Sequence, residues 1–152
     1  MNLEIRNAVV DDLPEIVRLI ADDYLGQQRE NFSLPLDAAY MDAFREIDAD
    51  ANNELVVALV DGKVVGTLQL TFTPSLSFHG GRRCTVESVR VDESLRSGGI
   101  GREMMVWAID RAKEKGCISM QLTSHNTRTR AHSFYEKLGF TATHIGMKLK
   151  LK

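Results

Sequence analysis

The segment 86–105 restricts the fold of this chain more than any other stretch, because it joins a β-branched run, a glycine-dense loop and the start of an amphipathic helix. Gly98, Gly99 and Gly101 remove side chains where the predicted helix begins. A helix N-terminus carries unpaired backbone N–H groups and the positive end of the helix dipole. The segment therefore predicts a strand–loop–helix unit that can hold an anion against bare backbone.

The loop 96–101, which reads Arg-Ser-Gly-Gly-Ile-Gly, departs from two common nucleotide-binding patterns. A phosphate loop has two glycines about five residues apart, followed by Lys and then Ser or Thr. The dinucleotide fingerprint has a third glycine about three residues after the second. The loop meets neither requirement, and taken alone it is equally compatible with a glycine-rich turn that only starts a helix.

The 152 residues suffice for a hydrophobic core, and we expect 1–152 to form a single domain. A net charge of −2 provides no field that attracts nucleic acid, so a small molecule is the expected partner. The chain shows no secretory signal and no apolar run of the ~18 residues that cross a membrane. These observations predict a cytoplasmic protein without nucleic-acid or membrane partners.

Thiols and imidazoles are scattered along the chain. Cys84 and Cys117 lack the Cys-x-x-Cys spacing of metal and redox sites, so we expect structural thiols rather than a disulfide or a nucleophile. The histidines also lack metal-ligand spacing, and no metal site is predicted. They are His79, His125, His132 and His144.

Apolar periodicity predicts strands and helices in alternation. Strands are expected at 3–6, 55–60, 63–72, 82–91 and 117–123, with one or two more within 140–149. Helices are expected at 13–21 after a cap at Asp11 or Asp12, at 36–48, at 100–115, and from a cap at Asn126 or Thr127 to Leu138. The segments 26–32 and 74–81 are expected to be loops, and Asp61-Gly62 a hairpin turn.

This order of elements predicts the fold class. The three strands between 55 and 91 follow one another closely, which favours antiparallel pairing. The strand, helix and strand between 82 and 123 form a right-handed crossover and therefore a parallel pair. We predict an α/β fold with a mixed sheet of α+β character, in which an antiparallel meander is followed by a βαβ unit. The glycine loop then lies beside the sheet, where such folds bind ligands.

Two distant segments carry a resemblance to a known family. Val89 and Val91 end the strand before the Arg-x-x-Gly-x-Gly loop, and 131–140 reads Ala-His-Ser-Phe-Tyr-Glu-Lys-Leu-Gly-Phe. These segments resemble the acyl-CoA pyrophosphate loop and the Phe-Tyr-x-x-x-Gly-Phe element of the GCN5-related N-acetyltransferase (GNAT) superfamily. With the His-x-Gly-Met-Lys-Leu at 144–149, the chain is similar to a bacterial small-molecule branch that has some likeness to aminoalkylphosphonate acetyltransferases.

The resemblance implies a GNAT-like acyl-CoA N-acyltransferase fold, with acetyl-CoA as co-substrate and no metal. The implied reaction moves the acetyl group to a primary amine of a small molecule by direct attack in a ternary complex. Acetylation of a protein or peptide, and a CoA-binding regulatory domain without turnover, stay open as alternatives. The segments 24–34 and 74–81 are expected to contact the acceptor. Oligomeric state is also open, with a homodimer common among relatives.

The chemistry needs a base, because an ammonium has no lone pair for attack. An amine with a pKa of ~10.4 is only about 0.04% neutral at pH 7. Glu87 is the candidate base, expected to share a face of an extended strand with Val89 and Val91. Burial beside an apolar acyl pocket would raise the pKa of its carboxyl group. The alternative is a structural carboxylate paired with Arg82 or Arg90.

The departing thiolate needs a proton, and a tyrosine with a pKa of ~10 can supply it. The resemblance places Tyr135 in that position. The alternative is a core tyrosine on the apolar stripe of the last helix. Tyr135 and Glu87 are thus the two predicted catalytic residues.

The resemblance also implies how the CoA thioester is held. Val89 and Val91 would contribute backbone groups that polarise the thioester carbonyl and pair with pantetheine. Loop amides, with the charges of Arg96 and Arg102, would take the pyrophosphate. Arg128 stands where many relatives have Asn, which leaves that polar contact open. The predicted cofactor-binding residues are Val89, Arg90, Val91, Arg96, Ser97, Gly98, Gly99, Ile100, Gly101, Arg102, Asn126 and Arg128.

Overall fold

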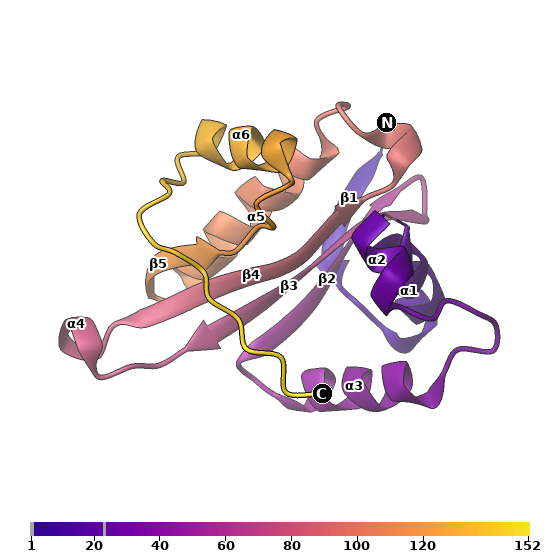
Figure 1. The fold of residues 1–152 in the computed structure, drawn as a ribbon, viewed down its shortest axis with the longest axis horizontal. Helices are drawn as coiled ribbons and strands as arrows, with labels where there is room; N and C mark the ends of the chain where they lie inside the picture. Colours follow the sequence, from indigo (N-terminus) through magenta and orange to yellow (C-terminus); the bar gives the residue numbers. More distant parts are fainter. Residues whose placement is uncertain (1, 23) are drawn as a thin grey trace.

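Five strands form one sheet in the order β1-β2-β3-β4-β5 in a computed structural model that describes residues 2–22 and 24–152 (Figure 1). The strands are β1 (Leu3–Asn7), β2 (Asn53–Val60), β3 (Lys63–Thr73), β4 (Arg82–Val91) and β5 (Cys117–Leu122). The first four pair antiparallel in sequence order, and β5 pairs parallel with β4. The predicted antiparallel meander followed by a βαβ unit is confirmed.

Helices cover both faces of the sheet (Figure 1). One face carries α5 (Ile100–Glu114) and α6 (Thr129–Lys137), and the other carries α1 (Leu13–Ala21) and α3 (Ala38–Ala49). The shorter segments are the 3₁₀ turns η1 (Val10–Asp12) and η2 (Glu93–Leu95) and the helices α2 (Tyr24–Arg29) and α4 (Ser77–Gly80). None of the described helices is both long and apolar enough to cross a lipid bilayer.

Alternation along β2 separates two hydrophobic cores. Val56 lies in the core under α5, whereas Val57 lies in the core under α1 and α3. Successive strand residues point to opposite faces, so one buried strand serves both layers. Met104 and Met105 of α5 are fully buried in the first core. Cys84 is buried there too, and both cysteines are free thiols.

A buried ion pair joins the start of β2 to the end of α5. Arg111 donates from Nε to the two carboxylate oxygens of Glu54 at 2.9 and 3.0 Å, and Glu54 is 7% exposed. These hydrogen bonds raise the pKa of Arg111, so the guanidinium stays charged.

Three local predictions are wrong at the level of helix ends and loops. The segment 74–81 was expected to be a loop, but it contains the short helix α4. The segment 26–32 was expected to be a loop, but α2 occupies most of it, with the Glu30 N–H donating to the Gly26 carbonyl at 2.8 Å. Its residues lack an apolar period, so tertiary packing rather than local pattern stabilises this turn. Neither Asn126 nor Thr127 caps α6, which begins after Arg128 without a side-chain cap.

The strands predicted within 140–149 are also absent from the described structure. Residues 140–152 contain neither helix nor strand, and 141–152 are exposed throughout. The alternation of apolar and polar residues there has the period of a strand, but a strand needs a hydrogen-bonding neighbour. The described part of a single chain supplies none for this segment.

Candidate active site

The parallel pair of β4 and β5 ends part of the way along β4. The last partners are Val86 and Leu122, whereas β4 continues to Val91. Residues 87–91 therefore have β3 as their only strand neighbour within the described residues. The two strands separate at this point and leave one edge of β4 facing a gap.

A β-bulge lies at the start of the gap. The pairing of β3 with β4 slips by one residue there, and Ser88 has a φ of 54°. A bulge adds one residue to one strand and changes which side chains face each side of the sheet. The strands thus separate where the resemblance implies that Val89 and Val91 offer their backbone groups.

The predicted orientation of Glu87 is wrong because of the bulge. Val86 lies in the core under α5, and on the other side of the bulge Val89 and Val91 pack against the same core. The parity of the core-facing positions therefore reverses, and Glu87 faces the side of α1 and α3, opposite to Val89 and Val91. The predicted burial is also absent, since Glu87 is exposed.

The arginines considered as partners of Glu87 have other contacts. Arg82 donates from Nη2 to the Asn52 side-chain oxygen. Arg90 donates from Nη1 to the Val89 carbonyl at 2.8 Å, which places its guanidinium along the gap-facing end of β4. The described ion pairs do not include Glu87.

The glycine loop connects the open end of β4 to α5. Asp92 accepts hydrogen bonds from the Ser94 N–H and hydroxyl at 3.1 and 2.7 Å, and Arg96 donates from Nε to the Val91 carbonyl at 3.3 Å. Ser97 and Gly99 have φ values of 68° and 88°, in the left-handed region that favours glycine. The loop therefore reverses the chain with most of its side chains exposed.

The first turn of α5 presents backbone donors at this end of the gap. Gly99 is the N-cap, and its carbonyl accepts the Glu103 N–H at 3.0 Å. The amides of Ile100, Gly101 and Arg102 precede that bond and have no partner inside the helix. The dipole of the 15-residue helix α5 adds positive charge at this end, so these amides form a site for an anion.

Gly101 is the point where three elements meet. A Cβ at this position would lie 3.5 Å from the Phe134 ring of α6 and 3.6 Å from Cγ2 of Val91 on β4. The first turn of α5, the open end of β4 and the middle of α6 thus converge. The two motifs that carried the family resemblance are brought together here.

Tyr135 follows Phe134 on α6 and lies in an aromatic cluster. Its ring meets Phe134 at 5.1 Å and Phe140 at 5.8 Å between centroids, both edge to face. Burial raises the pKa of the Tyr135 phenol, although the charges of Arg90 and Arg128 act to lower it. The phenol is therefore protonated at neutral pH. It also lies in the electrostatic field of two guanidinium groups, those of Arg90 on β4 and of Arg128.

Two histidines stabilise the loop between β5 and α6: His125 within the loop and His132 on α6. Thr127 donates its N–H to Nδ1 of His125 at 3.2 Å, and Nε2 of His132 contacts the His125 carbonyl at 3.0 Å. Asn126 is exposed in this loop, whereas Arg128 is half-buried and close enough to act on Tyr135. Of these two predicted cofactor-binding residues, Arg128 is the one whose charge acts on Tyr135.

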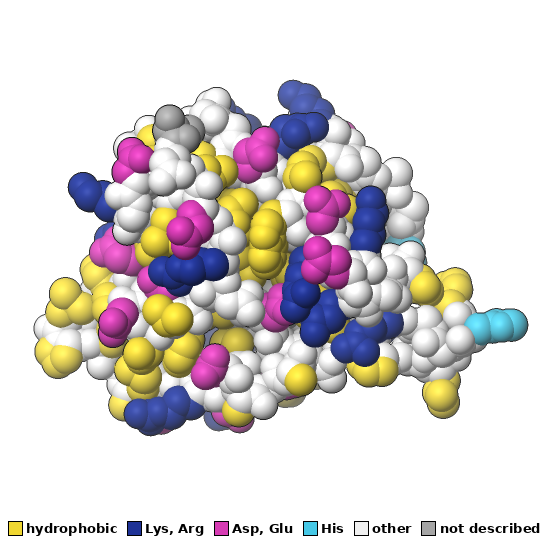
Figure 2. All heavy atoms as spheres, turned by 180° about the vertical axis from the view of Figure 1, so that it is seen from behind, with side chains coloured by type: hydrophobic (Ala, Val, Ile, Leu, Met, Phe, Trp, Pro, Cys, Tyr) yellow, Lys and Arg dark blue, Asp and Glu magenta, His cyan; other side chains and the backbone are white. Residues whose placement is uncertain are grey.

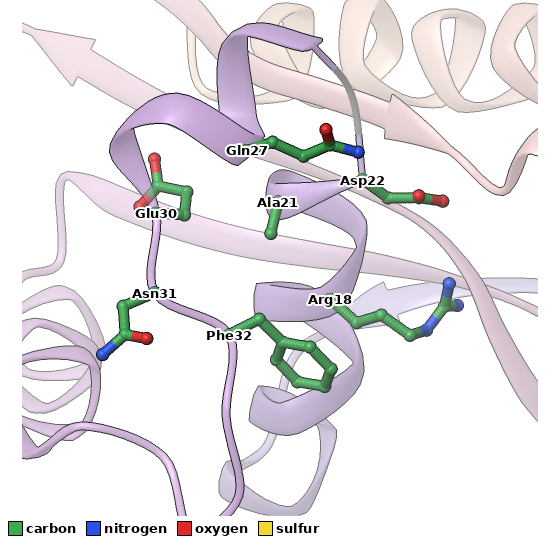
Figure 3. A pocket seen from close by; sticks show the side chains of 7 residues that line it. All are labelled: Arg18, Ala21, Asp22, Gln27, Glu30, Asn31 and Phe32. Atoms are coloured by element: carbon green, nitrogen blue, oxygen red, sulfur yellow. The ribbon is translucent and has the colours of Figure 1, made fainter.

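A cavity of about 450 Å³ lies on the opposite face of the sheet, between α1, α2 and the segment that follows (Figure 3). Its lining residues are Arg18, Ala21, Asp22, Gln27, Glu30, Asn31 and Phe32. Arg18 donates to Asp92 at 3.0 Å, which ties the cavity wall to the end of β4. Four lining residues come from the predicted acceptor segment 24–34.

The lining residues Arg18 and Ala21 of α1, and Asp22 directly after it, were not predicted. Arg18, Ala21 and Asp22 lie at the end of a helix whose sequence signal is its apolar stripe, and that stripe indicates burial rather than a cavity. These residues line the cavity only because α1 and α2 lie next to each other in the folded chain (Figure 3).

Comparisons with known proteins identify the family of this chain. The acetyltransferase (GNAT) family model matches residues 14–140, and the chain belongs to this family of acetyltransferase enzymes. The chain is 33% identical over 90 residues to glucosamine 6-phosphate N-acetyltransferase of Trypanosoma brucei brucei, an alignment that spans 59% of each chain. It is 28% identical over 142 residues to aminoalkylphosphonate N-acetyltransferase of Salmonella typhimurium, spanning 93% of this chain and 87% of that one.

A solved structure is similar over nearly the whole length. The crystal structure of a protein described as a transcriptional regulator from Bacillus halodurans C-125 is 47% identical, with a TM-score of 0.96. The match covers 99% of this chain and 100% of that one. The fold described here is thus shared with an experimental structure over nearly its whole length.

Proposed function

We propose that this chain, acting as one catalytic domain, transfers the acetyl group of acetyl-CoA to a primary amine of a small molecule by direct attack in a ternary complex. One observation carries the proposal. The β4–β5 pairing ends at Val86 and Leu122, and the resulting gap meets the amides of α5 at one end and is approached by Tyr135 from α6. A thioester seated there contacts an anion site, an exposed strand edge and an acid.

The diphosphate of CoA fits the first turn of α5. The amides of Ile100, Gly101 and Arg102 are charge-complementary to it, and the Arg96 and Arg102 side chains are exposed beside them. The exposed loop of Ser97, Gly98 and Gly99 lets phosphate oxygens approach the backbone closely.

The pantetheine arm fits the open edge of β4. An extended arm with amide groups can pair with backbone there as an added strand does. The bulge at Ser88 changes the direction of the backbone groups that follow it, and an N–H near Val89 that faces the gap would polarise the thioester carbonyl. In this role Val89, Arg90 and Val91 contribute backbone rather than side-chain chemistry.

Tyr135 would donate the proton that the departing sulfur needs. When the amine nitrogen bonds to the thioester carbon, the carbon–sulfur bond breaks and the electron pair leaves on sulfur. The raised pKa of Tyr135 keeps its proton available at neutral pH. The positive charges of Arg90 and Arg128 would then stabilise the phenolate until it is reprotonated.

Glu87 would accept the proton that the amine loses, directly or through water. The bulge turns Glu87 to the face that also carries the α1–α2 cavity. Thioester and amine would therefore approach the same point of β4 from different sides. An exposed carboxylate favours transfer through water over direct contact.

The cavity between α1 and α2 favours a small polar acceptor. Its lining carries charges of both signs, from Arg18, Asp22 and Glu30. A basic peptide would need a long acidic groove, whereas this cavity of about 450 Å³ fits a small molecule. The acceptors in the names of the two curated relatives, an amino sugar phosphate and an aminoalkylphosphonate, are of this size.

A regulatory role is the second candidate, because the similar Bacillus halodurans protein is described as a transcriptional regulator. The presence of Tyr135 and Glu87 beside the gap favours turnover. Calorimetry with acetyl-CoA and a free-thiol release assay over a panel of small amines separate the two. Binding with thiol release that depends on one amine supports catalysis; binding without release under any amine supports regulation; no binding at millimolar acetyl-CoA refutes both.

A further inference from the structure

The carboxylate of Asp92, directly after β4, holds two parts of the molecule at once. Its Oδ1 accepts the N–H and the hydroxyl of Ser94 at 3.1 and 2.7 Å, which caps the 3₁₀ turn η2. Its Oδ2 accepts a hydrogen bond from Nη2 of Arg18 at 3.0 Å. The hydrogen bonds from Ser94, and then the one from Arg18, lower the pKa of the Asp92 carboxyl group, so the group is charged at neutral pH.

The turn that Asp92 caps leads directly into the glycine loop. The Leu95 N–H donates to the Asp92 carbonyl at 2.9 Å, and the Gly98 N–H donates to the Leu95 carbonyl at 3.2 Å. Between them Ser97 has a φ of 68°, and a residue other than glycine keeps such a conformation only where its surroundings determine it. The position of Asp92 therefore helps to set where the amides at the start of α5 lie.

Arg18 belongs to the wall of the cavity between α1 and α2. Figure 3 shows its side chain extending away from Glu30 and Asn31, which lie across the cavity. Its Nε donates to Glu15 at 2.9 Å, while its Nη2 donates to Asp92. The planar fork of a guanidinium can hold two carboxylates in this way. The side chains of Arg18 and Asp92 are 30 and 24% exposed, so solvent screens their pair only in part.

We propose that Arg18 and Asp92 are positioning residues, and that their ion pair holds the glycine loop against the wall of the acceptor cavity. A side chain of the acceptor cavity then supports the binding of CoA. The inference rests on the proposed function for what the two sites bind. Neither side chain takes part in the proposed proton transfers. Without the pair, the loop keeps its cap on Ser94 but loses this tie to α1.

The proposed effect comes from the position of the charge rather than from its sign alone. Figure 2 shows basic and acidic side chains intermixed over the face opposite to the view of Figure 1, and the net charge is −2. Loss of one arginine therefore changes the overall field little. Arg45 pairs with Asp42 on α3, and these side chains are 70 and 71% exposed. Arg45→Met removes the same charge as Arg18→Met and is the matched control.

Calorimetry with CoA tests the positioning role. Arg18→Met is expected to raise the Kd for CoA by about three- to tenfold, and Arg45→Met is expected to leave it unchanged. Asp92→Asn keeps a side-chain oxygen for Ser94 and removes the charge that holds Arg18, so its Kd should rise by a similar factor. The double variant should bind no more weakly than either single variant. An unchanged Kd in either single variant, or additive losses in the double variant, overturns the proposal.

Kinetics separates positioning from a chemical role. In the thiol-release assay, Asp92→Asn is expected to raise the KM for acetyl-CoA by a larger factor than it lowers kcat, because the loop holds the diphosphate and not the reacting carbon. A fall in kcat without a rise in KM overturns the proposal. A native chain that binds no CoA refutes the proposed function instead.

Hydrogen exchange tests whether the pair holds the loop, and it needs no ligand. In Arg18→Met the amides of Leu95 and Gly98 are expected to exchange faster than in the native chain, whereas the amides of α5 beyond its first turn keep their protection. Native exchange at both loop amides means that the pair does not hold the loop. Faster exchange along the whole chain means that the variant is generally destabilised. Either result overturns the proposal.

Discussion

The first half of β4, residues 82–86, has a strand on each side, whereas the second half, 87–91, has β3 alone in the part of the chain that the structure describes. Cys84 and Val86 in the first half are buried, and Glu87 and Ser88 immediately after them are exposed. One strand thus serves two purposes. The paired half stabilises the sheet, and the open half, released by a bulge and by the end of β5, is the part proposed to meet substrates.

The largest expected effect concerns Tyr135, the proposed proton donor on α6. Tyr135→Phe should lower kcat by about 100-fold or more, because the sulfur loses its proton donor while the aromatic packing is kept. The raised pKa of Tyr135 predicts a rate that falls only as pH rises through that pKa, above its ordinary value near 10, and the variant should lack this limb. Steady-state kinetics over a pH series measures both. Unchanged kcat would leave Tyr135 a core residue.

The second effect concerns the end of the gap at α5. Gly101→Leu should raise the KM for acetyl-CoA by about 10- to 100-fold, because the added side chain presses on Phe134 and Val91 and shifts the amides that take the diphosphate. Initial rates at varied acetyl-CoA measure it, and the acceptor KM serves as the internal control. An unaltered KM for acetyl-CoA would place the anion site elsewhere.

The third effect contrasts one valine from each half of β4. Val86→Ala should lower the free energy of unfolding by about 2 kcal/mol, because the side chain is fully buried, without changing KM for acetyl-CoA. Val91→Ala, where the side chain is half-buried, should lose less than about 1 kcal/mol. Urea unfolding measures both variants. Equal losses would contradict the difference between the two halves.

The smallest effect concerns Glu87. Glu87→Gln should lower kcat/KM on the order of tenfold and flatten the acidic limb of the pH profile, less than a directly placed base because the carboxylate is exposed. Glu136→Gln, an exposed carboxylate on α6, is the matched control and should leave the profile unchanged. A normal acidic limb in Glu87→Gln would remove Glu87 from the role of base.

Local signals predicted most of the elements because their causes are local. The Asp61-Gly62 turn has the positive φ values that a tight hairpin requires, at 50° and 82°. The run 82–91 is the strand β4 with the predicted bounds, and the buried stripe of α5 follows its helical spacing. The parallel crossover also follows, because strand–helix–strand units have one hand.

The bulge could not be predicted, because its position carries a serine rather than a glycine. Ser88 adopts a φ of 54° although serine has no preference for that region. A strict two-residue alternation then places Glu87 on the wrong face. The slip exists because β3 and β4 pair with different numbers of residues, which is a property of two strands together.

The amino-acid sequence by itself determined the order of strands and helices, the glycine loop at the start of α5 and the two motifs that belong to the family. Those features depend on neighbours a few residues apart, whose sterics and hydrogen bonds act along the chain. Tertiary structure alone decided where β5 stops beside β4, which way Glu87 faces, how α1 and α2 line a cavity, and that the strand-like tail has no strand neighbour among the described residues. Each of these depends on segments distant in sequence, whose meeting is set by packing and hydrogen-bond pairing across the fold.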